Sequence, residues 1–213
     1  LYCKTNFIVG REIVMGYLKT MVDVMTTEMN AIRCLIDEAG IEYESIVSEI
    51  ANCEGKVIFM GVGKSAHIGK KLAATFASTG TPSFFIHATE AVHGDLGMIE
   101  SKDITILISN SGNSMEVVNC IKYIKAIGSK TIAFTSNRNS VLAKECDYAL
   151  IYPAKDEADH LNLAPTTSST ITLVLGDSIA CALSKSSNFG SSDFYKYHPG
   201  GSLGEKLKTA NNG

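Results

Sequence analysis

Hydrophobic residues recur every three or four positions along the first fifty residues of the chain. The run from Ile13 to Ile36 places its apolar side chains on one side of a helix, and Gly40 is well placed to end that helix. A second helical pattern covers Ile41 to Asn52. The sequence therefore predicts a long, methionine-rich amphipathic helix followed by a shorter one.

After Gly55, short apolar runs alternate with helical patterns. Five runs have the length and composition of β-strands: Val57–Met60, Ser83–Ile86, Ile104–Ser109, Thr131–Thr135 and Tyr148–Tyr152. The clearest helices between and after them are expected at Ala66–Ser78, Met115–Ile127 and Ser168–Lys185. Because the strands are apolar on both faces and alternate with helices, the pattern predicts an α/β fold, a doubly wound five-stranded parallel sheet flanked by helices.

Local signals set the ends of some elements. Asn113 and Glu116 have the spacing of a capping box at the start of the helix 115–127, and Gly128 is expected to stop that helix. The stretch Ser186–Ser192 is the most loop-like part of the chain before its tail.

Two strand ends carry small polar residues suited to phosphate. The first strand runs into Gly61-Val-Gly-Lys-Ser65, and the third runs into Ser109-Asn-Ser111-Gly-Asn-Ser114. Serine hydroxyls and backbone N–H groups at helix starts are the donors that a phosphate dianion needs. The candidate ligands are Ser65, Ser109, Ser111 and Ser114. The alternative is that glycine and serine only make tight strand-to-helix turns, but two such loops at neighbouring strand ends favour a shared phosphate site.

Composition narrows the class of protein. The chain has 213 residues, of which 45% are hydrophobic, enough for one well-filled domain. A net charge of −3 argues against nucleic acid as a partner. No apolar run approaches the roughly 20 residues of a membrane span. The six cysteines are scattered without metal-ligand spacing, which is typical of buried thiols in a reducing compartment, so we expect a cytoplasmic protein.

Several motifs together resemble a known family. They are Gly61-Val-Gly-Lys-Ser-Ala-His-Ile-Gly69, Phe76-Ala-Ser-Thr-Gly-Thr-Pro82, His93-Gly-Asp-Leu-Gly97, Ser109-Asn-Ser-Gly112, Leu163-Ala-Pro-Thr166 and His198-Pro-Gly-Gly201. This set resembles the sugar isomerase (SIS) domain of arabinose-5-phosphate isomerases. The resemblance implies an SIS-type fold, with residues 1–55 as helices that pack on the domain and form an oligomer interface, and residues 56–213 as the SIS domain. The CBS domain pair that usually follows in this family is not present before Gly213, so a single globular domain is expected.

The reaction implied by the resemblance interconverts D-ribulose 5-phosphate and D-arabinose 5-phosphate. This isomerisation feeds synthesis of Kdo for lipopolysaccharide or capsule. Moving a proton between C1 and C2 through an enediol requires a base and a group that stabilises the developing oxyanion, and it requires no metal or organic cofactor.

Four positions match residues that the family uses in catalysis: Lys64, Glu116, Glu157 and His198. Lys64 would stabilise negative charge on the enediolate or phosphate, and Glu116 or His198 would shuttle the proton. The alternatives are that Glu116 only completes the capping box and that Lys64 is only a counter-ion. His198 is expected to reach the site of a neighbouring subunit. Because the local sequence departs from the family's pattern before Leu163, Asp156 competes with Glu157 for the fourth place.

The resemblance also implies substrate contacts from Gly80, Thr81, His87 and His93. His87 is in addition matched to a position that binds an inhibitory zinc ion. The competing interpretation makes both histidines hydrogen-bonded structural residues and makes Thr81-Pro82 a plain turn.

Two other functions remain open: an isomerase of another sugar phosphate, and a non-catalytic phosphosugar-sensing SIS domain. Sensors of this kind usually carry a basic DNA-binding segment before the domain, and the first fifty or so residues here have few basic side chains. The apolar N-terminal helix predicts a homo-oligomer, specifically a homotetramer. A last hypothesis is direct inhibition by CMP-Kdo.

Overall fold

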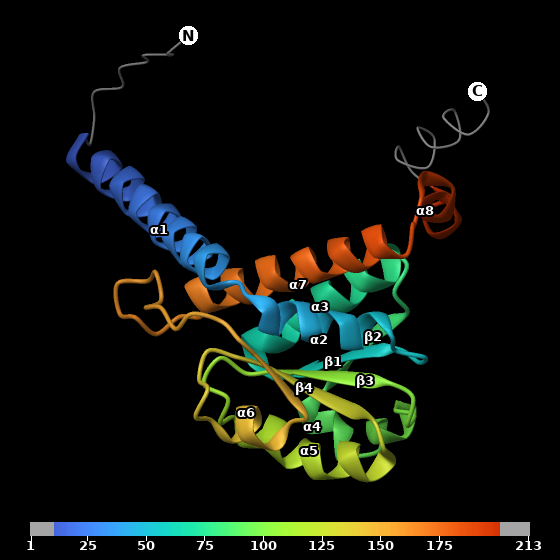
Figure 1. The fold of residues 1–213 in the computed structure, drawn as a ribbon. Helices are drawn as coiled ribbons and strands as arrows, with labels where there is room; N and C mark the ends of the chain where they lie inside the picture. The colour runs from blue at the N-terminus through green and yellow to red at the C-terminus, as the bar shows by residue number, and fades with distance from the viewer. Residues whose placement is uncertain (1–10, 201–213) are drawn as a thin grey trace, which may run out of the picture.

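The computed structural model of the chain describes residues 11–200. Five parallel strands form one sheet in the order β2-β1-β3-β4-β5 (Figure 1). The strands are β1 (Val57–Gly61), β2 (Ser83–His87), β3 (Ile104–Ile108), β4 (Lys130–Thr135) and β5 (Tyr148–Ile151). The five-stranded parallel sheet predicted from the apolar runs is thereby confirmed, and each predicted strand boundary lies within one residue of the observed one.

The strand order determines where a ligand is expected. β1 pairs with β2 on one side and with β3 on the other, so the chain reverses its winding direction between β1 and β3. At such a switch point the helices that follow the two strands leave toward opposite faces, and a crevice opens beyond the carboxyl ends of the strands. The two serine-containing loops follow these two strands.

Helices cover both faces of the sheet, which explains why the strands are apolar throughout (Figure 1). All five residues of β1 and all five of β3 are buried. One face packs against α2 (Ile41–Ala51), α3 (Gly63–Ser78) and α7 (Thr167–Ser186). The other packs against α4 (Ala88–Ala91), α5 (Met115–Ile127) and α6 (Val141–Glu145).

The first helix, α1 (Arg11–Glu38), lies against α7 through its C-terminal part and extends beyond the domain (Figure 1). Ala31 and Leu35 belong to the main core. Tyr17, Met21 and Met25 are each more than half exposed. The N-terminal part of α1 thus presents an apolar face that its own chain does not cover within the described residues.

The structure corrects three expectations. The N-cap of α5 is Ser114, and Asn113 is not its capping-box residue, because the Asn113 side-chain oxygen instead accepts from the backbone N–H of Val141. The loop expected at 186–192 is shorter, since α8 (Ser191–Tyr197) already begins there. Of the cysteines, Cys120 and Cys146 are buried as expected, but Cys181 is exposed.

The stop at Gly128 is confirmed, because this residue has a φ of 96° and ends α5 in the left-handed conformation. Among the described helices, none has the length and apolar character needed to cross a membrane.

Candidate active site

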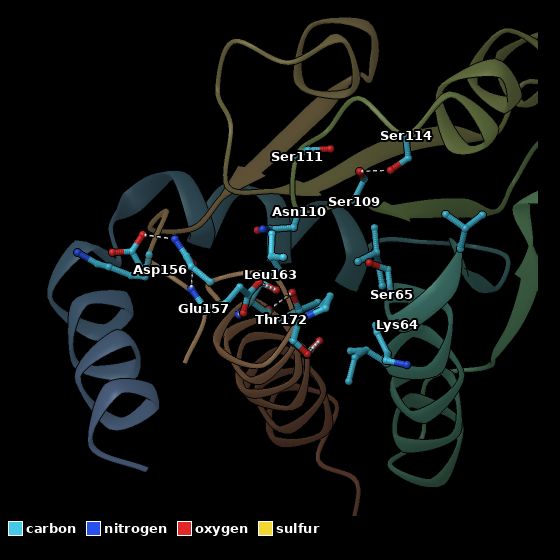
Figure 2. Close-up of a pocket in the computed structure, with 18 residues that line it drawn as sticks. Lys64, Ser65, Ser109, Asn110, Ser111, Ser114, Asp156, Glu157, Leu163 and Thr172 are labelled. Atoms are coloured by element: carbon cyan, nitrogen blue, oxygen red, sulfur yellow. Dashed lines mark hydrogen bonds between the residues drawn. The ribbon is translucent and has the colours of Figure 1, made fainter. Parts of the chain in front are cut away.

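A cavity of about 510 Å³ opens beyond the carboxyl ends of β1 and β3. Its walls come from the start of α3, the loop after β3, the segment that follows β5 and the start of α7. In Figure 2, Lys64 and Ser65 lie on the α3 side, whereas Asp156 and Glu157 lie on the opposite side of the view. The volume is within the range of small-molecule sites.

The start of α3 is an open helix N-terminus. Its N-cap, Val62, has no side chain that accepts a hydrogen bond, so the first backbone N–H groups of the helix have no capping side chain within residues 11–200 and can bind an anion. A Cβ at Gly61 would lie 3.3 Å from the backbone oxygen of Ile108, a close contact that favours glycine at this turn. Lys64, which is exposed, adds a positive charge to the same turn.

The loop after β3 is held in shape by its own serines. The buried Ser109 hydroxyl bonds to the Ser114 hydroxyl at 3.0 Å and accepts from the backbone N–H of Gly112 at 3.1 Å. Gly112 has a φ of 67°, and a Cβ there would lie 2.1 Å from the Ser140 hydroxyl oxygen. Ser109 is therefore a scaffold residue as well as a wall residue.

The start of α5 is also open. Ser114, its N-cap, makes no side-chain bond to the helix because its hydroxyl is paired with Ser109. Two helix N-termini without side-chain caps, each with a positive dipole end, thus follow neighbouring strands whose ends form this cavity.

The N-terminus of α7, by contrast, is closed by Glu157. One carboxylate oxygen accepts from the backbone N–H of Thr166 at 2.8 Å and of Ser168 at 3.1 Å, and the other accepts from the Ser168 hydroxyl. Of three helix starts at the cavity, one is neutralised by a carboxylate of the chain and two remain for a ligand. The cavity accordingly has a positive side at α3 and α5 and a carboxylate side at α7.

The segment from Pro153 to Thr166 forms the outer wall and is ordered by its own polar contacts. The Asp159 carboxylate accepts from the backbone N–H groups of Leu161, Leu163 and Ala164. Partial desolvation raises the pKa of Asp159, but these three donors outweigh it and leave the pKa below its ordinary value. Asn162, with a φ of 54°, bonds to the Asp156 carboxylate at 3.0 Å.

Six of the residues predicted from the sequence line this cavity: Lys64, Ser65, Ser109, Ser111, Ser114 and Glu157. Asp156, the competitor of Glu157, lines it too. The two carboxylates differ in their surroundings, because Glu157 is held by the start of α7 whereas Asp156 accepts from Asn162.

Three others lie at or after the carboxyl ends of β2 or β3 but are not among the cavity-lining residues of the described chain. Glu116 is exposed in the first turn of α5. His93 is exposed after α4. His87 ends β2, and its Nδ1 atom lies 2.7 Å from the Thr89 hydroxyl. Within residues 11–200, no group of three or more His, Cys, Asp or Glu side chains is placed to hold a metal ion.

The remaining three predicted residues lie at the other end of the molecule. α7 lines the cavity with its first turns, and its 20 residues span about 30 Å, so α8 and His198 follow at the far end (Figure 1). Gly80 and Thr81 precede β2 and border a separate depression with Leu183 at the end of α7. Within one chain, these residues are not brought together with the cavity.

The residues at the far end are packed with one another. A Cβ on Gly80 would lie 2.5 Å from the Phe189 ring, and that ring stacks on Tyr197 at 5.9 Å between centroids. His198 stacks on Phe194 at 4.0 Å. Gly80 and the α8 segment therefore belong to one surface region.

Sequence reasoning missed several wall residues: Asn110, Lys155, Asn162, Ser168, Ser169 and Thr172. Signals for two of these groups were present in the sequence. Asn110 stands between two selected serines, and the polar run from Thr166 to Thr170 was recognised only as the start of a helix. Because all three helices of the cavity begin at one edge, hydroxyls in the first turns of α7 were candidates as well.

Comparison with known proteins assigns the fold and the loops to a family. Residues 49–182 match the model of the SIS domain. The chain belongs to the SIS domain family. The match includes β1 to β5 and most of α7, hence every wall of the cavity described above.

Individual SIS proteins are similar over most of this chain. The arabinose 5-phosphate isomerase KpsF of Escherichia coli is 50% identical over 168 residues, covering 79% of this chain and 53% of that protein. The arabinose 5-phosphate isomerase KdsD of Francisella tularensis is 47% identical over 195 residues, covering 90% of this chain and 60% of that protein. The chain thus spans about half to three-fifths of the length of these curated relatives.

A solved structure, that of Escherichia coli CFT073 c3406 in complex with arabinose 5-phosphate, superposes with a TM-score of 0.85. It is 48% identical in sequence, and the alignment covers 87% of this chain and 98% of that chain.

Proposed function

We propose that this protein is an aldose-ketose isomerase that interconverts D-ribulose 5-phosphate and D-arabinose 5-phosphate. The observation that carries the proposal is the cavity in which two open helix N-termini face a carboxylate side. A phosphate group needs the helix N-termini as donors, and a sugar chain that exchanges a proton needs the carboxylate side. The similarity to KpsF, to KdsD and to the solved structure with bound arabinose 5-phosphate supports this sugar ester as the substrate.

In the proposed mechanism, the starts of α3 and α5 bind the phosphate with Ser65, Ser111 and Ser114. Lys64 stabilises negative charge on the phosphate or on the enediolate that forms when the proton leaves C2 or C1. Glu157 transfers a proton or orients the sugar. Asp156 is the alternative residue for this role. No metal or organic cofactor is invoked.

We propose that His198 acts in the cavity of a neighbouring copy, and that Glu116 or His198 shuttles the proton. The distance along α7 between the cavity and α8 supports this arrangement. Because Gly80 and Thr81 lie at the same end as α8, they would accompany His198. His87 and His93 remain predicted substrate contacts, and inhibitory zinc at His87 remains a prediction.

We further propose a homotetramer, in which residues 1–55 form the assembly segment and residues 56–213 the catalytic domain. The exposed apolar side chains on α1 support the assembly role, since a face of this kind is usually covered by another protein surface. The proposed role of His198 requires an assembly in which α8 of one copy reaches the cavity of another.

The proposed reaction supplies arabinose 5-phosphate to Kdo synthesis for lipopolysaccharide or capsule in the cytoplasm. Five free cysteines in the described chain fit a reducing compartment. Inhibition by CMP-Kdo remains a hypothesis. An unchanged rate and thermal midpoint at saturating CMP-Kdo would contradict it.

The test of the main proposal is to incubate the purified protein, without added metal, with D-arabinose 5-phosphate and to follow formation of ribulose 5-phosphate. Glucose 6-phosphate and sedoheptulose 7-phosphate serve as parallel substrates. We expect selective turnover of the arabinose ester, lost in the Lys64→Ala and His198→Ala variants. Binding of the ester without any turnover would instead support a phosphosugar sensor, and selective turnover of another ester would support a different isomerase.

A further inference from the structure

The hydroxyl groups on the α7 wall of the cavity already donate their protons to the protein. The Ser168 hydroxyl donates to Glu157, the Ser169 hydroxyl donates to the carbonyl of Pro165 at 3.1 Å, and the Thr172 hydroxyl donates to the carbonyl of Ser168 at 2.8 Å. Each hydroxyl carries one donor and two acceptor positions. This wall therefore offers a sugar mainly hydrogen-bond acceptors.

Asn110 lines the same cavity (Figure 2). Hydrogen bonds hold it at both its backbone and its side chain. Its backbone oxygen accepts from the Thr135 hydroxyl at 3.0 Å and from the backbone N–H of Ser136 at 3.1 Å. Its side-chain oxygen Oδ1 accepts from the Tyr152 hydroxyl at 3.2 Å. Among the described residues, its amide nitrogen Nδ2 donates to no protein group, so two N–H donors remain for a ligand.

Tyr152 is buried, with 2% of its surface exposed, and burial keeps its hydroxyl protonated as a hydrogen-bond donor. Burial raises the pKa of its hydroxyl to about 12, and the neighbouring Thr172 side chain partly opposes this shift. The hydroxyl thus keeps its proton throughout the physiological range. The amide of Asn110 is consequently held with its oxygen toward Tyr152 and its nitrogen away from it.

We propose that Tyr152 positions Asn110 so that the amide Nδ2 is the neutral hydrogen-bond donor for the sugar oxygens of a phosphosugar in this cavity. The inference rests on the proposed function and assigns a different part of the substrate to each group of cavity residues. Lys64 and the helix starts bind the phosphate, Asn110 donates to carbonyl or hydroxyl oxygens of the carbon chain, and the α7 hydroxyls accept from its O–H groups. The hydroxyls of an open-chain polyol both donate and accept, so a polyol can bond to both kinds of group, whereas a phosphate dianion only accepts.

The test is a double-mutant cycle with Asn110→Ala and Tyr152→Phe, measured by titration with D-arabinose 5-phosphate and, separately, with inorganic phosphate. Each single variant should lose affinity for the sugar ester by about three- to tenfold, as for one neutral hydrogen bond. Affinity for inorganic phosphate should stay within about twofold of the wild type. The double variant should bind the ester no more weakly than Asn110→Ala alone, because Tyr152 acts through Asn110.

Tyr43→Phe is the matched control. The Tyr43 hydroxyl donates to the backbone oxygen of Ile151 at 2.7 Å, next to Tyr152 along the chain, but Tyr43 does not line the cavity. This variant should lose stability comparably and retain its affinity for both ligands. A purely structural role of Tyr152 would make the two tyrosine variants behave alike.

Additive losses in the cycle, or equal losses for the ester and for inorganic phosphate, would overturn the inference. If Tyr152→Phe does not fold, the affinities of Asn110→Ala for the ester and for inorganic phosphate are the test. Equal losses for the two ligands would overturn the inference. A wild-type protein that binds the ester without turning it over would refute the proposed isomerase. The binding cycle would still test whether Asn110 donates to the sugar. Failure to bind any sugar phosphate would overturn both.

Discussion

Glu157 combines two roles that usually belong to different residues. Its carboxylate closes the N-terminus of α7 by accepting from the backbone N–H and the hydroxyl of both Thr166 and Ser168, and it also lines the cavity. A capping carboxylate is held rigidly, which suits a group that must keep one orientation toward a substrate. The same contacts mean that its removal will lower the stability of the fold in addition to any effect on turnover.

Glu157→Gln should therefore lower both stability and turnover. An amide at this position presents one acceptor oxygen in place of two, so a donor at the start of α7 loses its partner, at a cost of about 1–3 kcal/mol. If Glu157 transfers a proton, kcat should also fall by about 10²- to 10⁴-fold. Thermal unfolding and steady-state kinetics on arabinose 5-phosphate measure the two effects.

Asp156→Asn is the control for Glu157→Gln. Among the described residues, Asp156 accepts one side-chain bond, from Asn162. It should unfold close to the wild-type temperature and keep most of its kcat. A large loss of kcat in Asp156→Asn with normal turnover in Glu157→Gln would transfer the catalytic assignment to Asp156.

A second residue-scale prediction concerns Gly112. Alanine there would combine a left-handed backbone with a Cβ 2.1 Å from the Ser140 hydroxyl oxygen, so we expect a loss of more than about 2 kcal/mol in the free energy of unfolding. Gly63→Ala isolates the backbone effect, because Gly63 also has a positive φ, of 55°, but a Cβ there would meet no atom within 4 Å. It should cost about 1 kcal/mol. Equal losses in the two variants would show that the clash is relieved.

At this scale, sequence motifs identified the cavity-lining residues at the start of α3 and in the loop after β3 well, and the rest less well. The serines of the β3 loop are close in sequence and lie together. Gly80 and Thr81 also stand in a motif of the resemblance, but they come before a strand, and in a parallel sheet residues before and after a strand lie at opposite edges. Asn110 stands between two predicted serines, but its side-chain bond is to Tyr152, a partner 42 residues away that spacing along the chain does not reveal.

The helices and strands themselves were largely predictable because their packing requires the apolar pattern that the sequence displays. The strands are buried between two helical layers, so their runs are continuously apolar. The short helix α6 was not predicted, since its five residues are too few for a periodic pattern. The supposed capping box of α5 failed because Asn113 bonds to the α6 segment, a contact that spacing along the chain does not reveal.

Contacts between elements give a pH prediction at Asp147, between α6 and β5. Its carboxylate accepts from the backbone N–H and hydroxyl of Thr131 on β4 and pairs with Lys125 on α5 at 3.0 Å. Desolvation raises the pKa of Asp147, but Lys125 and Thr131 together bring it below its ordinary value of 3.8. A lowered pKa in the folded state stabilises the fold above the ordinary value, and this stabilisation disappears as the pH falls through the folded pKa.

Asp147→Asn should therefore unfold at a lower temperature than the wild type at pH 7, and the difference should shrink below about pH 4. The effect should stay under about 1 kcal/mol, since solvent screens the partly exposed pair. Asp37→Asn is the control, because Asp37 is exposed on α1 and makes no side-chain hydrogen bond among the described residues. A difference that persists unchanged at low pH would contradict the charge-based explanation.

For the whole molecule, the apolar face of α1 is the feature that a single chain leaves unexplained. Met21→Glu places a charge on this face, at a side chain that is 59% exposed in the single chain, and should shift the protein toward smaller species. Asn30→Glu adds the same charge on the opposite side of α1 and should leave assembly unchanged. Sedimentation velocity at micromolar concentration measures both, and a wild-type monomer would refute the assembly proposal.

The predicted site residues lie at opposite ends of the folded molecule, and this arrangement leads to a complementation test. If His198 acts in the cavity of another copy, His198→Ala and Lys64→Ala should each be inactive alone. Unfolded and refolded together in equal amounts, they should recover about a quarter of wild-type activity, because half the pairs are mixed and one of their two sites has both residues intact. If His198 acted within its own chain, every mixed site would lack one of the two residues and no activity would return. Turnover of arabinose 5-phosphate by the mixture, compared with each variant refolded alone, therefore distinguishes a shared active site from one completed by a single chain.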